Sequence, residues 1–400
     1  MSGPKALTAR SVAERWREVK TADQWWDDTY DTLRDLLKKY LEDSLEQELV
    51  EHLQAEQYQR NPDRVDCRNG YRRRSLATRL GIIRSLRVPR SRDGSYCSQI
   101  LSSHARRAVD MDAMACASFL AGVSTRRVGQ VMQPLTGEVI SPGTVSRISK
   151  ALDGAVRRYH ERQVGDDVRY LFLDGIGLRI KGVARVQHKM VLAAYALTTT
   201  GERILLDFRI ATAESTAQWE AFLNALYQRG LEGKNLHLII TDGNSGLHEA
   251  LQVVYGFVAR QRCWVHKLRN VMARLPVRVR DQCLAQLRTV YMAESKDNAR
   301  QRYRLWSEKW TASVPKAVAC VDKDIDDLLS FLAEPLVLAA KLRTTNAIER
   351  AFREVRRRTN PMSCFNNDAS CERIIYAVFH HQNETWQDRP LPDWPREHRP

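Results

Sequence analysis

Three acidic side chains stand where carboxylates could do chemistry. Asp174 and Asp242 each follow a run of apolar residues and precede a glycine, in the segments 169–176 and 237–243. An unbroken apolar run is typical of a buried strand, and a carboxylate at its end needs a partner charge or a metal. One such aspartate could simply cap a turn, but the pattern occurs twice. Glu349 lies in a stretch with helical character, so the three carboxylates can converge on a pair of divalent metals.

Three converging carboxylates indicate a particular reaction class. Oxygen ligands favour Mg²⁺ or Mn²⁺, and two such ions roughly 3.5–4 Å apart clamp the attacking and leaving oxygens of a phosphoryl transfer. One ion would activate water or a DNA 3′-hydroxyl, and the other would stabilise the leaving oxygen. No side-chain nucleophile is needed, and no Gly-rich nucleotide-binding loop indicates the use of ATP.

The residues around Glu349 extend this hypothesis. Glu349, Arg353 and Arg356 are spaced by four and three residues, so they share a helix face, with Asn346 one turn earlier. The two arginines could hold a DNA backbone beside the metals. The Glu349–Arg353 spacing is equally that of an ordinary surface ion pair.

Cys263 and His266 have the spacing of half a zinc site, but no second pair of ligands follows at zinc spacing. We therefore interpret His266 as lying near the three carboxylates, where it would orient a carboxylate or a phosphate. A buried histidine without a catalytic part remains the alternative.

The elements that must position these residues follow in a recognisable order. Strands are predicted at residues 169–176, 181–198 and 202–210, followed by an amphipathic helix at 215–230 and the strand that ends at Asp242. Strand-strand-strand-helix-strand is the order of a ribonuclease H-like α/β core. From Pro276 to about Leu338 the pattern is helical, which predicts a helical insertion between Asp242 and Glu349. A polar, proline-containing tail ends the chain.

The region before this core is basic and mostly helical. Residues 21–59 have apolar side chains at three- and four-residue steps and predict a helix, which either packs on its own domain or dimerises. The following stretch contains a turn signal, Asn69-Gly70, and alternating apolar residues that predict a hairpin. Its arginines form either a phosphate-gripping surface or a solvated edge; those taken for DNA contacts are Arg72, Arg73, Arg74 and Arg90.

Three short helices are expected next. One covers residues 111–120, a second starts after Val123 with Ser124 or Thr125 as its cap, and a third starts at Pro142 with Ser141 as its cap. The arrangement has helix-turn-helix character. Such a unit either reads DNA or is purely structural; its exposed DNA-binding residues would be Thr144, Arg147 and Lys150.

The composition agrees with a nucleic-acid partner. The 400 residues allow two or three domains, and 63 Lys and Arg against 48 Asp and Glu give a net charge of +15. A basic protein without a polyanionic partner would share that charge. The eight cysteines have no paired spacing, the first residues lack an apolar signal region, and no run has the length of a membrane span. We expect a cytoplasmic protein with no membrane association.

Together these segments resemble the bacterial Mutator-type insertion-sequence transposases, a family of DDE enzymes, over roughly residues 60–380. The resemblance is carried by Leu171-Phe172-Leu173-Asp174-Gly175, Thr241-Asp242-Gly243, Arg262-Cys263-Trp264-Val265-His266-Lys267, Thr345-Asn346-Ala347-Ile348-Glu349-Arg350, Arg68-Asn69-Gly70-Tyr71 and Ser141-Pro142-Gly143-Thr144.

The resemblance implies that Asp174, Asp242 and Glu349 are the catalytic triad and the ligands of two Mg²⁺ or Mn²⁺ ions, and that Cys263 and His266 are the family's Cys-x-x-His signature beside them. It implies cleavage at terminal inverted repeats and joining of the freed 3′ ends to target DNA, often through a circular intermediate. The partner would be double-stranded DNA in the bacterial nucleoid. Because two element ends must be paired, we expect a homodimer or a larger assembly.

The resemblance also implies a division of the chain. The expected parts are an N-terminal helical segment at 1–60, a basic hairpin-like region at 61–108, a helix-turn-helix-like region at 109–160, the first part of the core at 161–270, the helical insertion at 271–338, the last part of the core at 339–382 and a disordered tail at 383–400. Two alternatives stay open: a transposase-derived repressor without catalysis, and a ribonuclease H-like nuclease for DNA junctions or hybrids.

Overall fold

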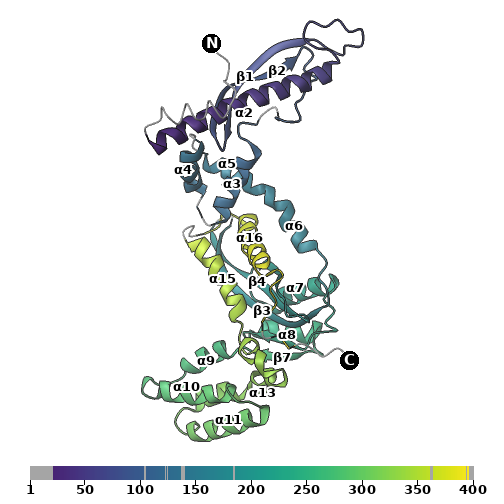
Figure 1. The fold of residues 1–400 in the computed structure, drawn as a ribbon. Helices are drawn as coiled ribbons and strands as arrows, with labels where there is room; N and C mark the ends of the chain where they lie inside the picture. Colours follow the sequence, from purple (N-terminus) through teal and green to yellow (C-terminus); the bar gives the residue numbers. More distant parts are fainter. Residues whose placement is uncertain are drawn as a thin grey trace. The chain divides into compact units, whose positions relative to one another are not determined.

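The chain forms two compact units, residues 1–150 and 151–400, coloured along the sequence in Figure 1. The structure is a computed structural model that describes residues 21–102, 105–121, 123, 125–136, 140–182, 185–360, 364–392 and 394–395. In this described part, none of the helices has the length and apolarity that crossing a bilayer requires. The predicted mixed α/β class is confirmed, because helices surround a mixed sheet.

The first unit is built on a long helix, α2 (Ala22–Leu53). It begins at Thr21, whose hydroxyl accepts a hydrogen bond from the Gln24 backbone N–H at 3.3 Å. It ends where Gln54 adopts a left-handed backbone conformation, with φ 53°. The helix is therefore shorter than the predicted stretch to residue 59.

A two-stranded hairpin, β1 (Arg68–Thr78) and β2 (Gly81–Ser91), packs against α2 through a small apolar core. The turn lies between the strands, immediately before Gly81. The prediction of a turn at Asn69-Gly70 is wrong: this pair lies inside β1, where the register with β2 shifts between Arg68 and Tyr71. Gly70 has a left-handed backbone conformation, with φ 65°. Both a β-bulge and a tight turn use glycine in this conformation, so the Asn-Gly pair could not distinguish a bulge from a turn.

Three helices complete the first unit: α3 (Val109–Leu120), α4 (Thr125–Thr136) and α5 (Pro142–Ser149). The predicted start of α5 is confirmed. The Ser141 hydroxyl accepts a hydrogen bond from the Thr144 backbone N–H at 3.2 Å, and Pro142 occupies the first turn. Ser124, one of the two caps expected for α4, lies outside the described residues.

The second unit is organised around a five-stranded sheet with the order β5-β4-β3-β6-β7. Strands β3 (Val168–Lys181), β4 (Val186–Thr198) and β5 (Arg203–Ala211) are antiparallel neighbours. Strands β6 (Leu238–Thr241) and β7 (Ala259–Arg262) are added in parallel to β3. The three predicted strands and the Asp242 strand therefore form, with boundaries shifted by a few residues.

Helices cover both faces of this sheet. Leu171 and Leu173 of β3 enter a core with α7 (Thr216–Gln228) and α8 (Ser245–Val254). The alternate residues of β3, which include Phe172 and Asp174, face the side of α15 (Asn346–Thr359) and α16 (Asp368–Trp386). Coverage on both faces explains why the run before Asp174 is apolar at every position.

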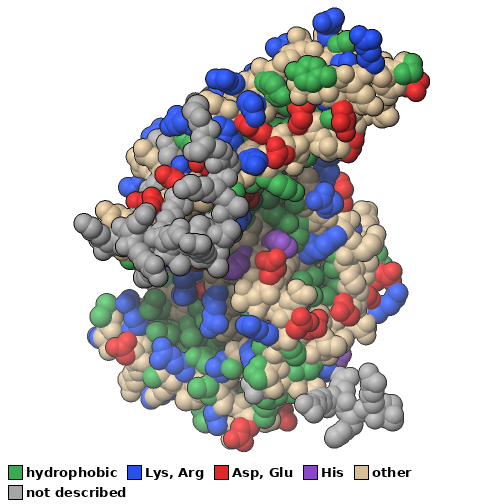
Figure 2. Space-filling model, turned by 45° about the horizontal axis from the view of Figure 1, so that its top comes forward, with side chains coloured by type: hydrophobic (Ala, Val, Ile, Leu, Met, Phe, Trp, Pro, Cys, Tyr) green, Lys and Arg blue, Asp and Glu red, His purple; other side chains and the backbone are tan. Residues whose placement is uncertain are grey.

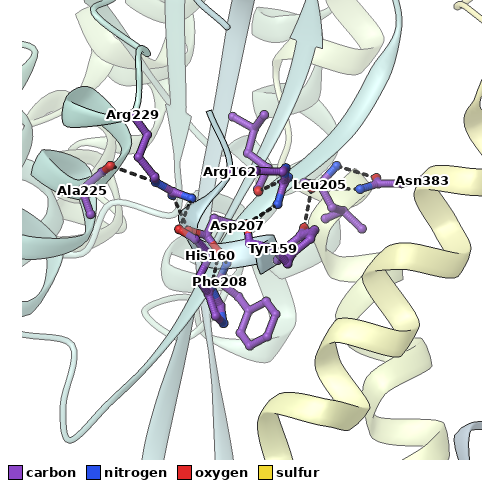
Figure 3. A network of polar contacts seen from close by, with 10 residues as sticks. Tyr159, His160, Arg162, Leu205, Asp207, Phe208, Ala225, Arg229 and Asn383 are labelled. Carbon is purple, nitrogen blue, oxygen red and sulfur yellow. Dashed lines mark hydrogen bonds and ion pairs between the residues drawn. The ribbon is translucent and has the colours of Figure 1, made fainter. Parts of the chain in front are cut away.

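A polar network holds the edge strand β5 in place (Figure 3). The buried Asp207 carboxylate contacts His160 Nδ1 at 2.7 Å and accepts a hydrogen bond from Arg229. At the open edge of the strand, the Leu205 backbone N–H donates to Asn383 Oδ1 at 2.8 Å, and the Asn383 amide donates back to the Leu205 carbonyl at 3.0 Å. These contacts join α6 (Asp153–Glu161), α7 and α16 to β5 and pair backbone groups that an edge would leave exposed.

The predicted helical insertion also forms. The elements after β7 are α9 (Trp264–Met272), α10 (Val277–Tyr291), α11 (Lys296–Trp310), α12 (Pro315–Asp322), α13 (Ile325–Leu328), the short 3-10 turns Ser330–Ala333 and Leu336–Leu338, and α14 (Ala339–Leu342).

The described residues after Asp368 are more ordered than their composition indicates. Helix α16 was not predicted and runs to Trp386, beyond the expected start of the tail at residue 383. The Leu391 backbone N–H then donates to the Gly201 carbonyl at 2.9 Å, and the Trp394 indole donates to the Thr199 carbonyl at 2.9 Å. Contacts with the β4–β5 turn, which lies far away in sequence, order this polar segment.

Candidate active site

Asp174 lies in the middle of β3, in the most buried part of the sheet. Its side chain is only 5% exposed, and its backbone pairs with Ala193 of β4. One carboxylate oxygen accepts a hydrogen bond from the Gly175 backbone N–H at 2.8 Å. Burial, followed by the negative charge of Asp242, raises the pKa of Asp174 to about 7. The negative charge of Asp174 is therefore unfavourable at this buried position unless a cation lies nearby.

Asp242 immediately follows β6, whose last residue, Thr241, is in register with Leu173. The parallel pairing of β6 with β3 therefore brings Asp242 to the level of Asp174. Its Oδ1 accepts a hydrogen bond from the Asn244 backbone N–H at 2.9 Å, and the Asn244 side chain caps α8. Gly243 has φ 90°, and a Cβ there would meet the Arg262 guanidinium at 2.2 Å, so only glycine fits this turn.

Glu349 enters from α15, one turn into the helix. Ile348, Phe352 and Val355 bury the adjacent side of the helix, so the half-buried Glu349 lies at the edge of that contact. Its Oε1 lies 3.6 Å from His266 Nε2 and 3.7 Å from Arg269 Nη1. The tertiary structure thus brings together the helix-borne glutamate and the histidine of α9.

The charge of His266 acts on Asp174, and its Nε2 lies 3.6 Å from Glu349 Oε1. Its contact with the Cys263 thiol, together with the charges of Asp174 and Asp242, outweighs burial and raises the pKa of His266 to about 9. An imidazolium there offsets part of the negative charge that the carboxylates concentrate.

Cys263 has a structural role, because its hydrogen bonds connect two segments of the site. Its backbone N–H donates to the Thr241 carbonyl at 2.7 Å, and its Sγ accepts hydrogen bonds from the backbone N–H of Thr345 at 3.4 Å and from its hydroxyl at 3.5 Å. Burial raises the pKa of the thiol, but contact with His266 and Thr345 outweighs it, so the pKa lies below its usual value. Cys263 therefore links the strand before Asp242 to the start of the Glu349 helix.

The residues present suit a divalent cation. Glu349 Oε1 is buried and has no hydrogen-bond partner among the described residues, and Asp174 and Asp242 repel each other. Within the described part of the chain, no three His, Cys, Asp or Glu side chains lie close enough to share one metal ion. Holding an ion would therefore require these carboxylates to draw closer together.

A fourth carboxylate, Glu214, stands beside this group and was not predicted. A Cβ on Gly175 would lie 2.0 Å from Glu214 Oε1, so the missing side chain of Gly175 makes room for the glutamate. Glu214 Oε2 accepts a hydrogen bond from the Asn244 side chain at 3.3 Å. Burial, followed by the charge of Asp242, raises the pKa of Glu214 to about 6. No motif spacing identifies Glu214; the one sequence signal was the glycine that follows Asp174.

The predicted DNA-contacting residues differ in their surroundings. Arg353 and Arg356 of α15 are exposed, while Asn346 lines a pocket on another side of that helix. In the first unit, Arg147 and Lys150 are exposed, whereas Thr144 is half-buried and its hydroxyl accepts a hydrogen bond from Ser141.

The hairpin arginines also divide into two kinds. Arg72, Arg73 and Arg90 are exposed, but Arg74 is half-buried and its guanidinium donates to the Ser102 carbonyl at 3.1 Å. Arg74 thus has an internal partner. Lys and Arg side chains recur across the molecular face drawn in Figure 2, as the net charge of +15 indicates.

Comparison with known proteins places this chain in a family. A model of the family described as "Transposase, Mutator family" matches residues 9–389. The chain belongs to the Mutator family of transposases. It is 33% identical over 358 residues to the transposase for insertion sequence element ISRM5 of Rhizobium meliloti, covering 90% of this chain and 89% of the relative.

Other relatives of this transposase are similar over comparable lengths. The transposase for element IS1081 of Mycobacterium tuberculosis is 31% identical over 372 residues, covering 92% of this chain and 89% of the relative. The transposase for element IS256 in transposon Tn4001 of Staphylococcus aureus is 29% identical over 359 residues, covering 89% and 91%. Membership of the family confirms the resemblance seen in the sequence and implies a transposase role with DNA as the substrate.

Proposed function

We propose that this chain is a DDE transposase that cleaves DNA at the terminal inverted repeats of its element and joins the freed 3′ ends to target DNA. The observation that supports the proposal is that Asp242, directly after β6, lies level with Asp174 of the neighbouring strand β3, and that the charges of His266 and Glu349 act on Asp174. The mixed strand order, with an antiparallel meander extended by two parallel strands, supports a ribonuclease H-like core.

Each carboxylate would hold its position for a physical reason. The strand pairing of β3 and β6 fixes the two aspartates relative to each other, and Cys263 fixes the start of the Glu349 helix to the same edge. Asp174, Asp242 and Glu349 would hold Mg²⁺ or Mn²⁺. When bound, two such ions supply an activated water or 3′-hydroxyl and stabilise the leaving oxygen.

The remaining residues would serve the DNA. His266 Nε2 and Arg269 Nη1, which lie 3.6 Å and 3.7 Å from Glu349 Oε1, would orient this carboxylate, and Arg353 and Arg356 would continue its face as phosphate contacts. In the first unit, the exposed Arg72, Arg73 and Arg90, and the Arg147 and Lys150 side of α5, would bind the repeats, the latter in the manner of a helix-turn-helix reader. Pairing two ends would require a homodimer or a larger assembly.

The test is Mg²⁺-dependent cleavage of a labelled duplex that carries the flanking element end, with wild type compared with Glu349→Gln. We expect site-specific cutting and joining by wild type, and retained DNA binding without chemistry in Glu349→Gln. Glu308→Gln makes the same substitution on the exposed side of α11 and should cut like wild type.

Other outcomes would change the assignment. Binding without cutting by wild type as well as Glu349→Gln would indicate a DNA-binding repressor. Cutting by Glu349→Gln at the wild-type rate would remove this residue from the mechanism and turn attention to Glu214 as the third acid.

A further inference from the structure

A pocket of about 700 Å³ lies between α15, α16 and β4 in the second unit. Its volume is within the range of about 300–1,000 Å³ that small-ligand sites occupy. Asn346, Arg350 and Arg357 face it from α15, on a side turned roughly 100° from Glu349 around the helix. The pocket is therefore separate from the carboxylates but is carried by the same helix.

The lining is strongly cationic. Five of its residues are Lys or Arg and one is Glu; they are Arg203, Lys341, Arg350, Arg357, Arg358 and Glu354. Glu354 is engaged by Arg357 at 2.7 Å and by Arg358 at 2.9 Å. Arg350 is exposed and has no ion-pair partner among the described residues. A surplus of guanidinium groups around one hollow suits a phosphate.

One wall of the pocket is aromatic. The Trp386 ring is half-buried and lies 5.8 Å from the ring of the buried Tyr195, which in turn lies 5.2 Å from Phe172. The Arg203 guanidinium lies 5.4 Å from the centre of the Trp386 ring. Planar groups of this kind bind the face of a nucleobase.

Two polar atoms in the lining lack partners although they are buried. Among the described residues, neither Arg203 Nε nor Gln382 Oε1 has a hydrogen bond. A buried polar atom without a partner is destabilising, and one donor and one acceptor without partners in the same lining suit a ligand with both kinds of atom. The edge of a nucleobase carries acceptors and donors side by side.

We propose that this pocket binds a nucleotide, with its base against Trp386 and Tyr195 and its phosphate against Arg350 and Arg357. The nucleotide is either one residue of an unpaired DNA strand or a free mononucleotide, since both carry this chemistry. The site goes beyond the proposed cleavage activity, and binding can be measured without divalent ions, so the failure of one proposal would not imply the failure of the other.

The experiment measures fluorescence anisotropy of a labelled thymidine tetranucleotide with the full chain in EDTA at fixed salt. Arg350→Glu should weaken binding by about tenfold or more. Arg304→Glu reverses the same charge on the exposed side of α11 and should weaken it by about twofold or less. Trp386→Ala should weaken binding by about tenfold through the lost stacking. Thermal unfolding of each variant checks that the fold is retained.

Two further ligands sharpen the result. Wild type should bind an abasic tetranucleotide with the same backbone about tenfold more weakly than the thymidine tetranucleotide. Wild type and Trp386→Ala should bind the abasic ligand equally well. Competition by thymidine monophosphate would identify the free nucleotide as a ligand, whereas its failure to compete would assign the site to a DNA strand. Equal losses in Arg350→Glu and Arg304→Glu, or full binding of the abasic ligand, would overturn the proposal.

Discussion

Removing one partly buried carboxylate, Asp324, should destabilise the second unit by several kcal/mol. Asp324 accepts hydrogen bonds from Lys267 Nζ and, at 2.6 Å, from Arg262 Nη1. Lys267 is 1% exposed, and within the described part of the chain its only other hydrogen bond goes to the Cys320 carbonyl at 2.9 Å. Asp324→Asn removes the negative charge and leaves the ammonium group buried without a counter-ion.

The size of the stability loss depends on whether Lys267 keeps its proton once Asp324 is neutral. Breaking a buried ion pair by removing one partner typically costs about 3–5 kcal/mol of unfolding free energy. Lys267 can escape by losing its proton, and neutralising a lysine with an ordinary pKa of about 10.4 at pH 7 costs about 4.6 kcal/mol, which is an upper limit. Burial already lowers the pKa of Lys267 in the native protein. We therefore expect a loss of about 3–4 kcal/mol.

Urea unfolding followed by tryptophan fluorescence measures this loss, because Trp264 lies three residues before Lys267 in α9 and its indole donates to the Leu328 carbonyl of α13. Asp326→Asn is the matched control: Asp326 pairs with Arg300 on the surface, where such a pair contributes less than about 1 kcal/mol.

A second variant tests the physical reason. Lys267→Met with Asp324→Asn removes the unpaired lysine charge and should be more stable than Asp324→Asn alone, since replacing a buried charge with an apolar group of similar volume is well tolerated. Equal costs for Asp324→Asn and Asp326→Asn, or no recovery in the double variant, would refute the reasoning.

Two further predictions concern DNA. Gly175→Ala should lower strand cleavage by about 10²-fold while the fold is retained. The added Cβ would lie 2.0 Å from Glu214 Oε1 and would displace that carboxylate. Gly177→Ala, whose Cβ would meet only the flexible Met190 sulfur at 3.6 Å, should cut normally, and equal activity in the two variants would contradict this role. Arg73→Ala should weaken binding to the repeat duplex and reduce the slope of log K against log salt by about 1, whereas Arg304→Ala should leave the slope unchanged. An unaltered slope in Arg73→Ala would remove this residue from the phosphate contacts.

Much of the fold could be predicted because its signals are local. Apolar runs predicted the strands before Asp174 and Asp242, and the Ser141-Pro142 pair predicted the start of α5, since capping depends on residues three or four apart. The same locality caused the error at Asn69-Gly70, because a left-handed glycine serves a bulge and a turn equally well.

The meeting of side chains was decided by tertiary structure alone. The sequence by itself determined three carboxylates, a basic chain and the order of the strands around them. It did not determine that Glu214 would fill the space beside Gly175, or that Cys263 would bind Thr345. Those contacts join segments that are tens of residues apart, and no periodicity within either segment records the other. Only the packing of the sheet against its helices, which minimises exposed apolar surface over the whole unit, brings them together.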